Sequence, residues 1–386
     1  MKAVHSGITV NQTKIEFLES GDSIVLNSHK CICLGTTMKP AIALLIALVL
    51  TPPAALYAAD LELTEKLQLP ECHSLGWARN NSQPVAQQKG AWAVDPVLWQ
   101  QAVQQKGEGK KEDTAFSLWV PERIEYVKGI VVISGHGSGE ALYKHPELRE
   151  LARDLHLAIF KFIGNPMQRG FWPTSLLYDR LKAFGEKSKH PELEHAPLFL
   201  YGHSNGTGFS GVFPATESAR VWAWVSMRPG TTQMVDQPNA AHVPGLVMFG
   251  EDDPYFARPS RKENLAIIET MRKDHSALWN CAVEPKTGHG PGAKSWPLVF
   301  SFLRHTWAAR VPVEADPRKG PVKLTALTLE SGQLGTNWDS AKGGYQPLPI
   351  APFAEFTGDK STASWLVNAA FAADWQTFQR EGQVGK

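Results

Sequence analysis

Residues 202–206 read Gly-His-Ser-Asn-Gly and follow directly on the apolar run Pro-Leu-Phe-Leu-Tyr at residues 197–201. The apolar run predicts a buried strand, and the glycines allow the chain to turn sharply from that strand into a helix. A turn of the form G-x-S-x-G holds a serine oxygen clear of its neighbours, beside a backbone N–H. We therefore expect Ser204 to act as a nucleophile. The alternative is a glycine-rich turn without chemistry, because such short motifs also arise by chance.

A second glycine-rich loop lies upstream, where residues 135–139 read Gly-His-Gly-Ser-Gly after the strand-like run at residues 129–134. Glycines in such a loop let backbone N–H groups approach a ligand closely, as the oxyanion hole of acyl transfer requires. One of the two donors usually belongs to the residue after the nucleophile. We assign the donors to Asn205 and Ser138, and we expect His136 to contact the substrate. A plain tight turn is the alternative for this loop.

A third strand-like run ends in an acidic turn. Residues 245–249 are apolar and lead into Gly-Glu-Asp-Asp-Pro at residues 250–254. An acid at the end of a strand is well placed to orient a histidine. We prefer Asp253 to Asp252 because Asp253 directly precedes the proline that ends the strand. A helix N-cap is the alternative role for either aspartate.

The best candidate for a general base is His289, which lies between two glycines after the strand-like run at residues 279–284. A loop of this kind can bring an imidazole to the serine, and an aspartate can fix its tautomer through the other ring nitrogen. We expect His203, inside the elbow, to pack or bond locally. Four further histidines are assigned no catalytic role because they lie among helix-like or charged residues: His145, His190, His195 and His305.

The order Ser204, Asp253, His289, with each residue at the end of a strand-like run, resembles the α/β-hydrolase fold family over residues 114–308. The chain looks more like the secreted esterases, polyhydroxyalkanoate depolymerases and dienelactone-hydrolase-like members than the large lipases. The resemblance implies a serine hydrolase that cleaves a small-molecule or polymeric carboxylic ester through an acyl-enzyme intermediate, without a cofactor. Thr207 departs from the glycine or alanine that commonly follows the elbow in esterases.

Two alternatives to ester hydrolysis stay open. A peptidase or amidase uses the same three residues, and a catalytically silent α/β-hydrolase can act as a binding protein, because fold does not dictate function. Composition argues against other classes: the 39 basic and 38 acidic residues give a net charge of +1, which does not suggest a nucleic-acid partner. The sequence contains neither H-E-x-x-H nor G-x-x-x-x-G-K, so no metal site or phosphate-binding loop is predicted.

Outside these motifs, apolar strand-like runs alternate with amphipathic helical patterns. Residues 146–155, for example, place leucines at i, i+3 and i+7 on one helix face. Repeated βαβ units predict an α/β fold with a doubly wound, mostly parallel sheet, in which ligands gather at the carboxyl ends of the strands. Further predicted strands are residues 158–163 and 221–225, and further predicted helices are residues 174–186, 207–218, 264–273 and 297–309.

The chain divides into four predicted parts. They are an upstream extension at residues 1–37, a signal peptide at 38–59, an α/β-hydrolase domain at 60–310 and a small β-rich C-terminal appendage at 311–386. In the appendage, apolar and polar residues alternate over residues 322–329, which predicts a half-exposed strand, and a helix is expected at residues 364–380.

Two loops are expected to overhang the catalytic edge of the sheet. They span residues 164–173 and 227–230 and contain aromatic and cationic side chains. We expect Trp172 to line an acyl or aryl pocket and Arg228 to meet a carboxylate of the substrate. A solvent-facing arginine is the alternative for Arg228.

Residues 38–59 have the pattern of a secretory signal peptide. Lys39 supplies a positive charge, residues 41–50 form an apolar core, and the small residues Ala58 and Ala59 lie at the expected cleavage site. We therefore expect a periplasmic or secreted protein without stable membrane insertion after cleavage. A retained anchor is the alternative, because the residues three positions before either cleavage site are large.

The cysteines fit an exported protein. Cys31 and Cys33 precede the signal segment, so Cys72 and Cys281 remain in the mature chain. Two cysteines in an oxidising compartment can pair. Such a bridge would tie the N-terminal segment to the strand before His289, and two buried thiols are the alternative.

Overall fold

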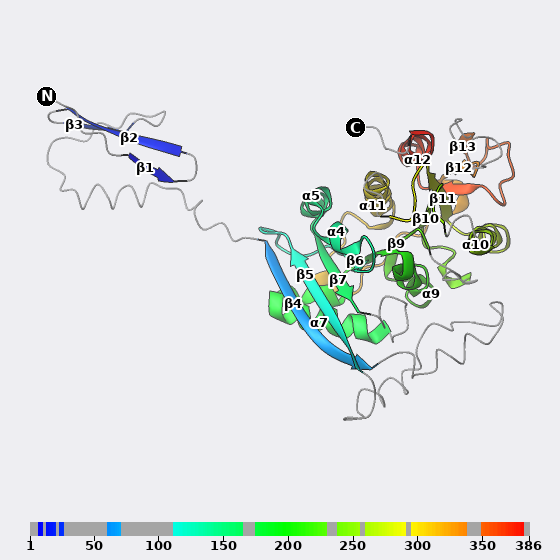
Figure 1. Cartoon of the computed structure of the whole chain (residues 1–386), viewed down its shortest axis with the longest axis horizontal. Coiled ribbons are helices and arrows are strands. Elements are labelled where there is room, and N and C mark those ends of the chain that lie inside the picture. The colour runs from blue at the N-terminus through cyan, green and yellow to red at the C-terminus, as the bar shows by residue number, and fades with distance from the viewer. Residues whose placement is uncertain are drawn as a thin grey trace. The chain divides into compact units, whose positions relative to one another are not determined.

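The computed structural model describes residues 7–10, 13–20, 23–26, 60–70, 111–164, 174–229, 238–254, 259–290, 295–337 and 349–381. It divides into two compact units, residues 1–59 and 60–386 (Figure 1). In the first unit the strands β1 (Gly7–Val10), β2 (Thr13–Ser20) and β3 (Ser23–Leu26) form an antiparallel sheet in that order. The predicted signal segment, Cys72 and Trp172 lie outside the described residues.

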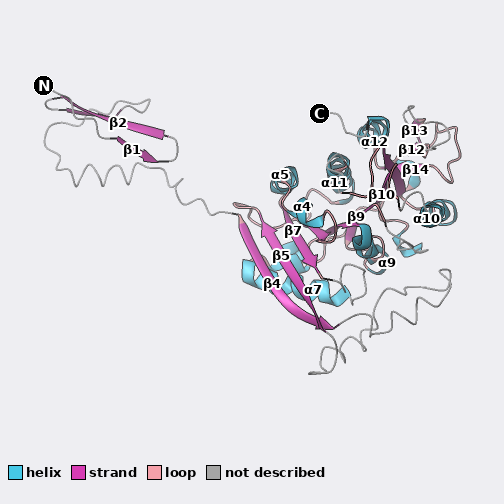
Figure 2. Ribbon diagram, in the orientation of Figure 1, coloured by secondary structure: helices cyan, strands magenta, loops and turns pink. Residues whose placement is uncertain are grey.

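The second unit is built on an eight-stranded sheet, whose strands are magenta in Figure 2. The strand order is β11-β10-β9-β8-β6-β7-β5-β4. The strands are β4 (Leu61–Pro70), β5 (Lys111–Val120), β6 (Gly129–Ser134), β7 (Leu157–Ile163), β8 (Leu198–His203), β9 (Val221–Met227), β10 (Gly245–Gly250) and β11 (Trp279–Glu284). β5 pairs antiparallel with both of its neighbours, and every other neighbouring pair in this sheet is parallel. The predicted α/β class and mostly parallel sheet are confirmed.

The central strands are apolar because helices cover both faces of the sheet. Alternate residues of β6 belong to different hydrophobic clusters: Ile130 and Val132 lie in one, Val131 and Ile133 in the other. The first cluster contains side chains of α7 (Thr174–Ser188) and α10 (Pro259–His275), and the second contains those of α5 (Pro146–Leu155) and α11 (Trp296–Arg310). The sheet is therefore doubly wound, as predicted.

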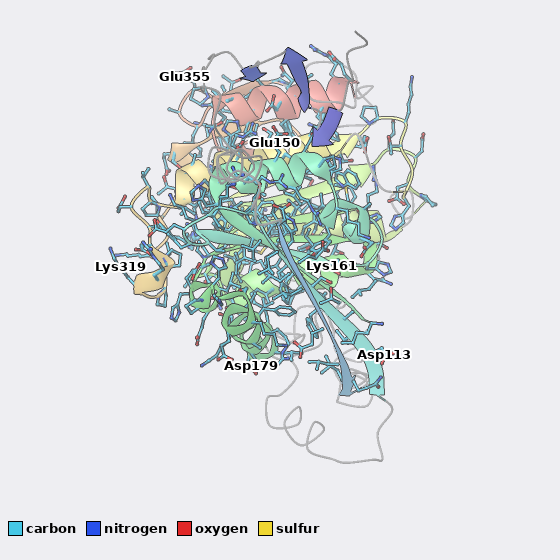
Figure 3. All side chains as sticks on the ribbon, turned by 90° about the vertical axis from the view of Figure 1, so that its left-hand side faces the viewer. Asp113, Glu150, Lys161, Asp179, Lys319 and Glu355 are labelled. Carbon is cyan, nitrogen blue, oxygen red and sulfur yellow. The ribbon has the colours of Figure 1, made fainter. Side chains whose placement is uncertain are left out.

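The antiparallel ribbon of β4 and β5 extends beyond the rest of the sheet. β5 pairs with β7 only from Ala115 to Trp119, whereas its pairing with β4 runs along both strands. Asp113 lies near the far end of this ribbon (Figure 3), and its carboxylate accepts a hydrogen bond from the amide of Gln68. Within the described ranges, no helix is both long and apolar enough to cross a lipid bilayer.

The helix predicted at residues 207–218 is broken into short pieces. The 3₁₀-helix η5 (Ser204–Gly206) leads into α8 (Thr207–Ser210), and α9 (Phe213–Thr216) follows after a turn. Pro214 explains the break because it has no backbone N–H to bond to the carbonyl of Ser210, so the chain starts a new helix with proline in its first turn.

The C-terminal appendage contains a second small sheet and a helix. The antiparallel sheet has the order β13-β12-β14, formed by β12 (Gln333–Gly335), β13 (Ile350–Pro352) and β14 (Ser364–Leu366). The helix predicted at residues 364–380 is instead this last strand followed by α12 (Ala369–Glu381). Asn368 caps α12, with its side-chain oxygen accepting the N–H of Phe371 at 2.9 Å.

The strand predicted at residues 322–329 is wrong. Exposed and half-buried residues do alternate there through much of the segment, but the segment itself forms no strand. It is tied instead to the end of α11: the N–H of Thr325 donates to the carbonyl of Arg310, whose guanidinium donates back to the carbonyl of Thr325 at 2.7 Å. The alternation over residues 322–329 therefore indicated a half-buried segment correctly, but this segment is not part of a sheet.

Side chains of the appendage cover the edge strand β11. The N–H of Cys281 donates to Oγ of Ser364 at 2.9 Å, and the N–H of Val283 donates to Oε1 of Gln379 at 3.1 Å. The indole N–H of Trp375 donates to the carbonyl of Cys281 at 3.0 Å. These contacts replace a ninth strand and protect the edge from pairing with another chain. The predicted bridge from Cys281 to Cys72 stays a prediction.

Candidate active site

Four loops of the site leave the same edge of the sheet. β6 leads into the glycine-rich loop, β8 into the elbow with Ser204, β10 into the turn with Asp253, and β11 into the loop with His289. Because these strands run parallel, their carboxyl ends bring the three predicted triad residues together.

Ser204, His289 and Asp253 form a hydrogen-bonded row. Oγ of Ser204 lies 2.9 Å from Nε2 of His289, and Nδ1 of His289 lies 2.8 Å from Oδ2 of Asp253. The imidazole of His289 is thus within reach of the serine hydroxyl proton, and the carboxylate is bonded to the other ring nitrogen. This geometry suits proton transfer from the serine to the histidine.

The elbow holds Ser204 in a strained conformation. Its φ is +54°, in the left-handed region that non-glycine residues seldom occupy. Glycine is required on both sides of Ser204 because neighbouring atoms lie too close for a side chain. A Cβ on Gly202 would collide with the carbonyl oxygen of Gly206, and a Cβ on Gly206 would lie 2.6 Å from Oγ of Ser134. The predicted need for glycine on both sides of the serine is explained by these contacts.

The acidic turn brings Asp253, and not Asp252, to the histidine. Asp253 is 1% exposed, whereas the side chain of Asp252 is exposed to solvent. The backbone N–H of Asp252 donates to the carbonyl of Thr287 at 3.0 Å, so the acidic turn and the histidine loop are also joined through their main chains. The aspartate that the sequence analysis preferred, next to the proline, is the one that contacts His289.

His203 is buried between two loops of the site. It is 3% exposed, its Nδ1 accepts the backbone N–H of Ser138 at 2.9 Å, and its Nε2 lies 3.0 Å from the carbonyl oxygen of His289. The first contact requires an unprotonated Nδ1, so this network assigns the proton to Nε2, which donates to the carbonyl. Burial, followed by the nearby charges of His289, Arg228 and His136, lowers the pKa of His203 to about 4.

The role predicted for Ser138 is corrected by this arrangement. Its N–H donates to His203 and is not directed at a substrate oxygen, and its Oγ lies 2.7 Å from the hydroxyl of Tyr201. The N–H of Asn205, which directly follows the nucleophile, stays the predicted oxyanion donor. The half-buried His136 lies beside the elbow, and its contact with substrate stays a prediction.

The helix after the glycine-rich loop is anchored to the sheet. α4 (Gly139–Tyr143) begins directly after Ser138. Lys161 of β7, labelled in Figure 3, pairs with Glu140 of this helix, and its Nζ lies 4.6 Å from the ring centroid of Tyr143. The ion pair therefore fixes the chain just after the glycine-rich loop, while Ser138 of that loop contacts His203.

The substrate role predicted for Arg228 is wrong in this structure. Arg228 is fully buried, and its guanidinium forms an ion pair with the buried carboxylate of Glu284 and donates to the carbonyl of Gly290. Oγ of Ser295 donates to the same carboxylate. Neither the burial of the cation nor its partner was visible from the sequence, because Glu284 lies at the end of β11, far from Arg228 along the chain.

The histidine loop is therefore held at two consecutive carbonyls. His203 donates to the carbonyl of His289, and Arg228 donates to the carbonyl of Gly290. Glycines flank His289, so without these donors its backbone would be free to adopt other conformations. Among the described residues, no group of His, Cys, Asp or Glu side chains is arranged to hold a metal ion.

The fold is similar to that of several solved structures. The chain resembles a poly(3-hydroxybutyrate) depolymerase of Bordetella parapertussis at 14% identity, over 54% of this chain and 88% of that one, with a TM-score of 0.38. An S-formylglutathione hydrolase of Agrobacterium tumefaciens is 13% identical over 52% and 89% of the two chains, with a TM-score of 0.37. A ferulic acid esterase is 12% identical over 64% and 95%, with a TM-score of 0.38.

No protein-family model matches the chain, and no curated protein matches it. The chemistry of the site is therefore inferred from the positions and contacts of its own residues.

We predict that Arg228→Met destabilises the fold and is not simply a substrate-binding variant. The substitution would leave the Glu284 carboxylate buried without its cation, which typically costs about 3–5 kcal/mol of unfolding free energy. Urea denaturation at neutral pH measures this loss, and the double variant Arg228→Met, Glu284→Gln should regain part of it. If the unfolding free energy of Arg228→Met lies within about 1 kcal/mol of the parent value and its KM is raised, the predicted role of Arg228 in substrate binding would be supported instead.

Proposed function

We propose that the protein is a serine hydrolase that cleaves carboxylic esters through an acyl-enzyme intermediate. The observation that carries this proposal is the row of hydrogen bonds from Ser204 through His289 to Asp253, at 2.9 and 2.8 Å. The strained φ of Ser204 supports it, because strain of this kind clusters at functional sites.

In the proposed reaction, Oγ of Ser204 attacks the ester carbonyl carbon while Nε2 of His289 takes its proton. Asp253 stabilises the resulting imidazolium through the proton on Nδ1, and the N–H of Asn205 donates to the carbonyl oxygen as it becomes negative. The tetrahedral intermediate collapses, the C–O bond to the alcohol breaks, and His289 gives its proton to the departing alcohol. Water, activated by the same histidine, then hydrolyses the acyl-serine.

Esters are the first substrate class to test for a chemical reason. An alkoxide leaves a tetrahedral intermediate more easily than an amine, which must be protonated first, so ester cleavage demands less of the general acid. Amide or peptide hydrolysis by the same three residues stays the nearest rival. A silent binding protein is the other alternative.

Initial rates on p-nitrophenyl esters from acetate to decanoate test this proposal, with the chain from Asp60 as enzyme. We expect a rate maximum at one acyl length, and a loss in kcat on the order of 10⁴-fold or more in Ser204→Ala, because the covalent route disappears. Ser218→Ala is the matched control: it lies in the turn before β9, at the amino end of that strand and so at the opposite edge of the sheet.

The proposal fails if the parent protein is no faster than Ser204→Ala on every ester. A p-nitroanilide series run in parallel then separates an amidase, which would release p-nitroaniline in a Ser204-dependent way, from a protein without hydrolytic activity.

We also propose that the chain is exported and that residues 38–59 are removed. The division of the structure between Ala59 and Asp60 supports a boundary at that point. When the full chain is expressed in a bacterium with an outer membrane, we expect the periplasmic or secreted protein to begin at or next to Asp60. Protein that stays in the cytoplasm with these residues attached would contradict export.

A further inference from the structure

We propose that His203 is a positioning residue that joins the glycine-rich loop to the loop of the catalytic histidine. This inference rests on the proposed hydrolase function. The side chain sits on the last residue of β8, directly before the nucleophile, and contacts one loop through each ring nitrogen. A single imidazole therefore bridges the two loops.

The geometry of the two contacts is specific for a neutral imidazole. One ring nitrogen must accept the N–H of Ser138 while the other donates to the carbonyl of His289, a pattern that an Nε2-protonated histidine satisfies completely. A protonated ring would turn both nitrogens into donors and place an N–H against the N–H of Ser138. The loop and the histidine therefore select one tautomer of one protonation state.

The glycine-rich loop is shaped around the His203 ring. Gly137 has a φ of +60°, and a Cβ at this position would overlap the imidazole at Nδ1. The loop thus needs glycine here both for its backbone conformation and to admit the ring. A contact this close indicates that the loop and the ring are fitted to each other.

Because His203 is neutral, the positive charge that forms at the site during the proposed reaction is carried by His289 alone. Its ring centroid lies 5.3 Å from that of His289, which becomes an imidazolium during the proposed reaction. The lowered pKa of His203 means that no second positive charge opposes this step. Its only ring proton is engaged with a carbonyl, so His203 does not compete for the proton of Ser204.

Loss of the bridge should act on turnover more than on binding. The contact to the carbonyl of His289 fixes the backbone of the residue whose ring must stay 2.9 Å from Ser204. Small displacements of a catalytic group lower the rate steeply, by up to about 100-fold for about 1 Å. Both bonds of His203 go to backbone groups and neither goes to the side chain of His136, which is expected to contact the substrate, so KM should change little.

Three variants test the inference with p-nitrophenyl ester kinetics. We expect His203→Phe, which keeps an aromatic ring but makes neither bond, to lower kcat by about 10- to 100-fold with KM within about threefold. His203→Gln offers an amide oxygen and an amide N–H, and it should recover most of kcat. Tyr201→Phe is the control: it removes the hydroxyl contact to Ser138 but not the link to His289, so its effect should be smaller than about threefold.

A spectroscopic measurement tests the bridge without activity. Nitrogen-15 NMR of the histidine side chains should show His203 with a proton on Nε2 and none on Nδ1, unchanged from pH 8 to pH 5.5. A His203 ring that carries a proton on Nδ1 in this range would overturn the inference, even if His203→Phe failed to fold.

The outcomes for the two proposals are distinguishable. If the parent protein shows no Ser204-dependent hydrolysis, the proposed function fails and the NMR spectrum alone decides whether the bridge exists. If the parent is active and His203→Phe keeps its kcat, the hydrolase stands and the positioning role is overturned.

Discussion

Parallel pairing of the central strands is the constraint on which the site depends. β6, β8, β10 and β11 point the same way, so the loops that follow them emerge at one edge although they are widely separated in sequence. A reversal of any one strand would carry its loop to the opposite edge. The helices on both faces and the appendage along β11 keep these strands buried and in register. The topology of the sheet thus determines where the site forms, and the individual side chains determine its detailed geometry.

His289 depends on its neighbours for a fixed position. Its loop has glycine on both sides, and its main chain is held by donors from two other strands, His203 at the end of β8 and Arg228 just after β9. The buried carboxylate of Glu284 in turn holds Arg228. A flexible loop is thereby made rigid by buried polar groups, each of which has a specific partner.

Much of the site could be predicted from local sequence, because its chemistry lies at strand ends that the sequence marks. Apolar runs followed by glycine or proline located Ser204, Asp253 and His289, and the structure joins them by hydrogen bonds. The errors concern side chains whose partners are distant in sequence. Ser138 was predicted as a free donor and Arg228 as a substrate ligand, and each is bonded to a buried residue on another strand.

The errors in the fold have a similar origin. Alternation over residues 322–329 predicted a strand, but the partner of that segment is the end of a helix. The helix predicted at residues 207–218 is too long because Pro214 interrupts the backbone hydrogen bonding of the helix. The periodicity of apolar residues indicates which side chains are buried, whereas the tertiary fold decides which element they pack against.

The measurement that tests the central claim most directly is covalent labelling with a fluorophosphonate, followed by mass mapping of the modified peptide. The account predicts one label per chain, on Oγ of Ser204, and labelling that is much slower in His289→Ala because the serine loses its base. Absence of a label on the parent protein, or a label on another serine, would contradict it.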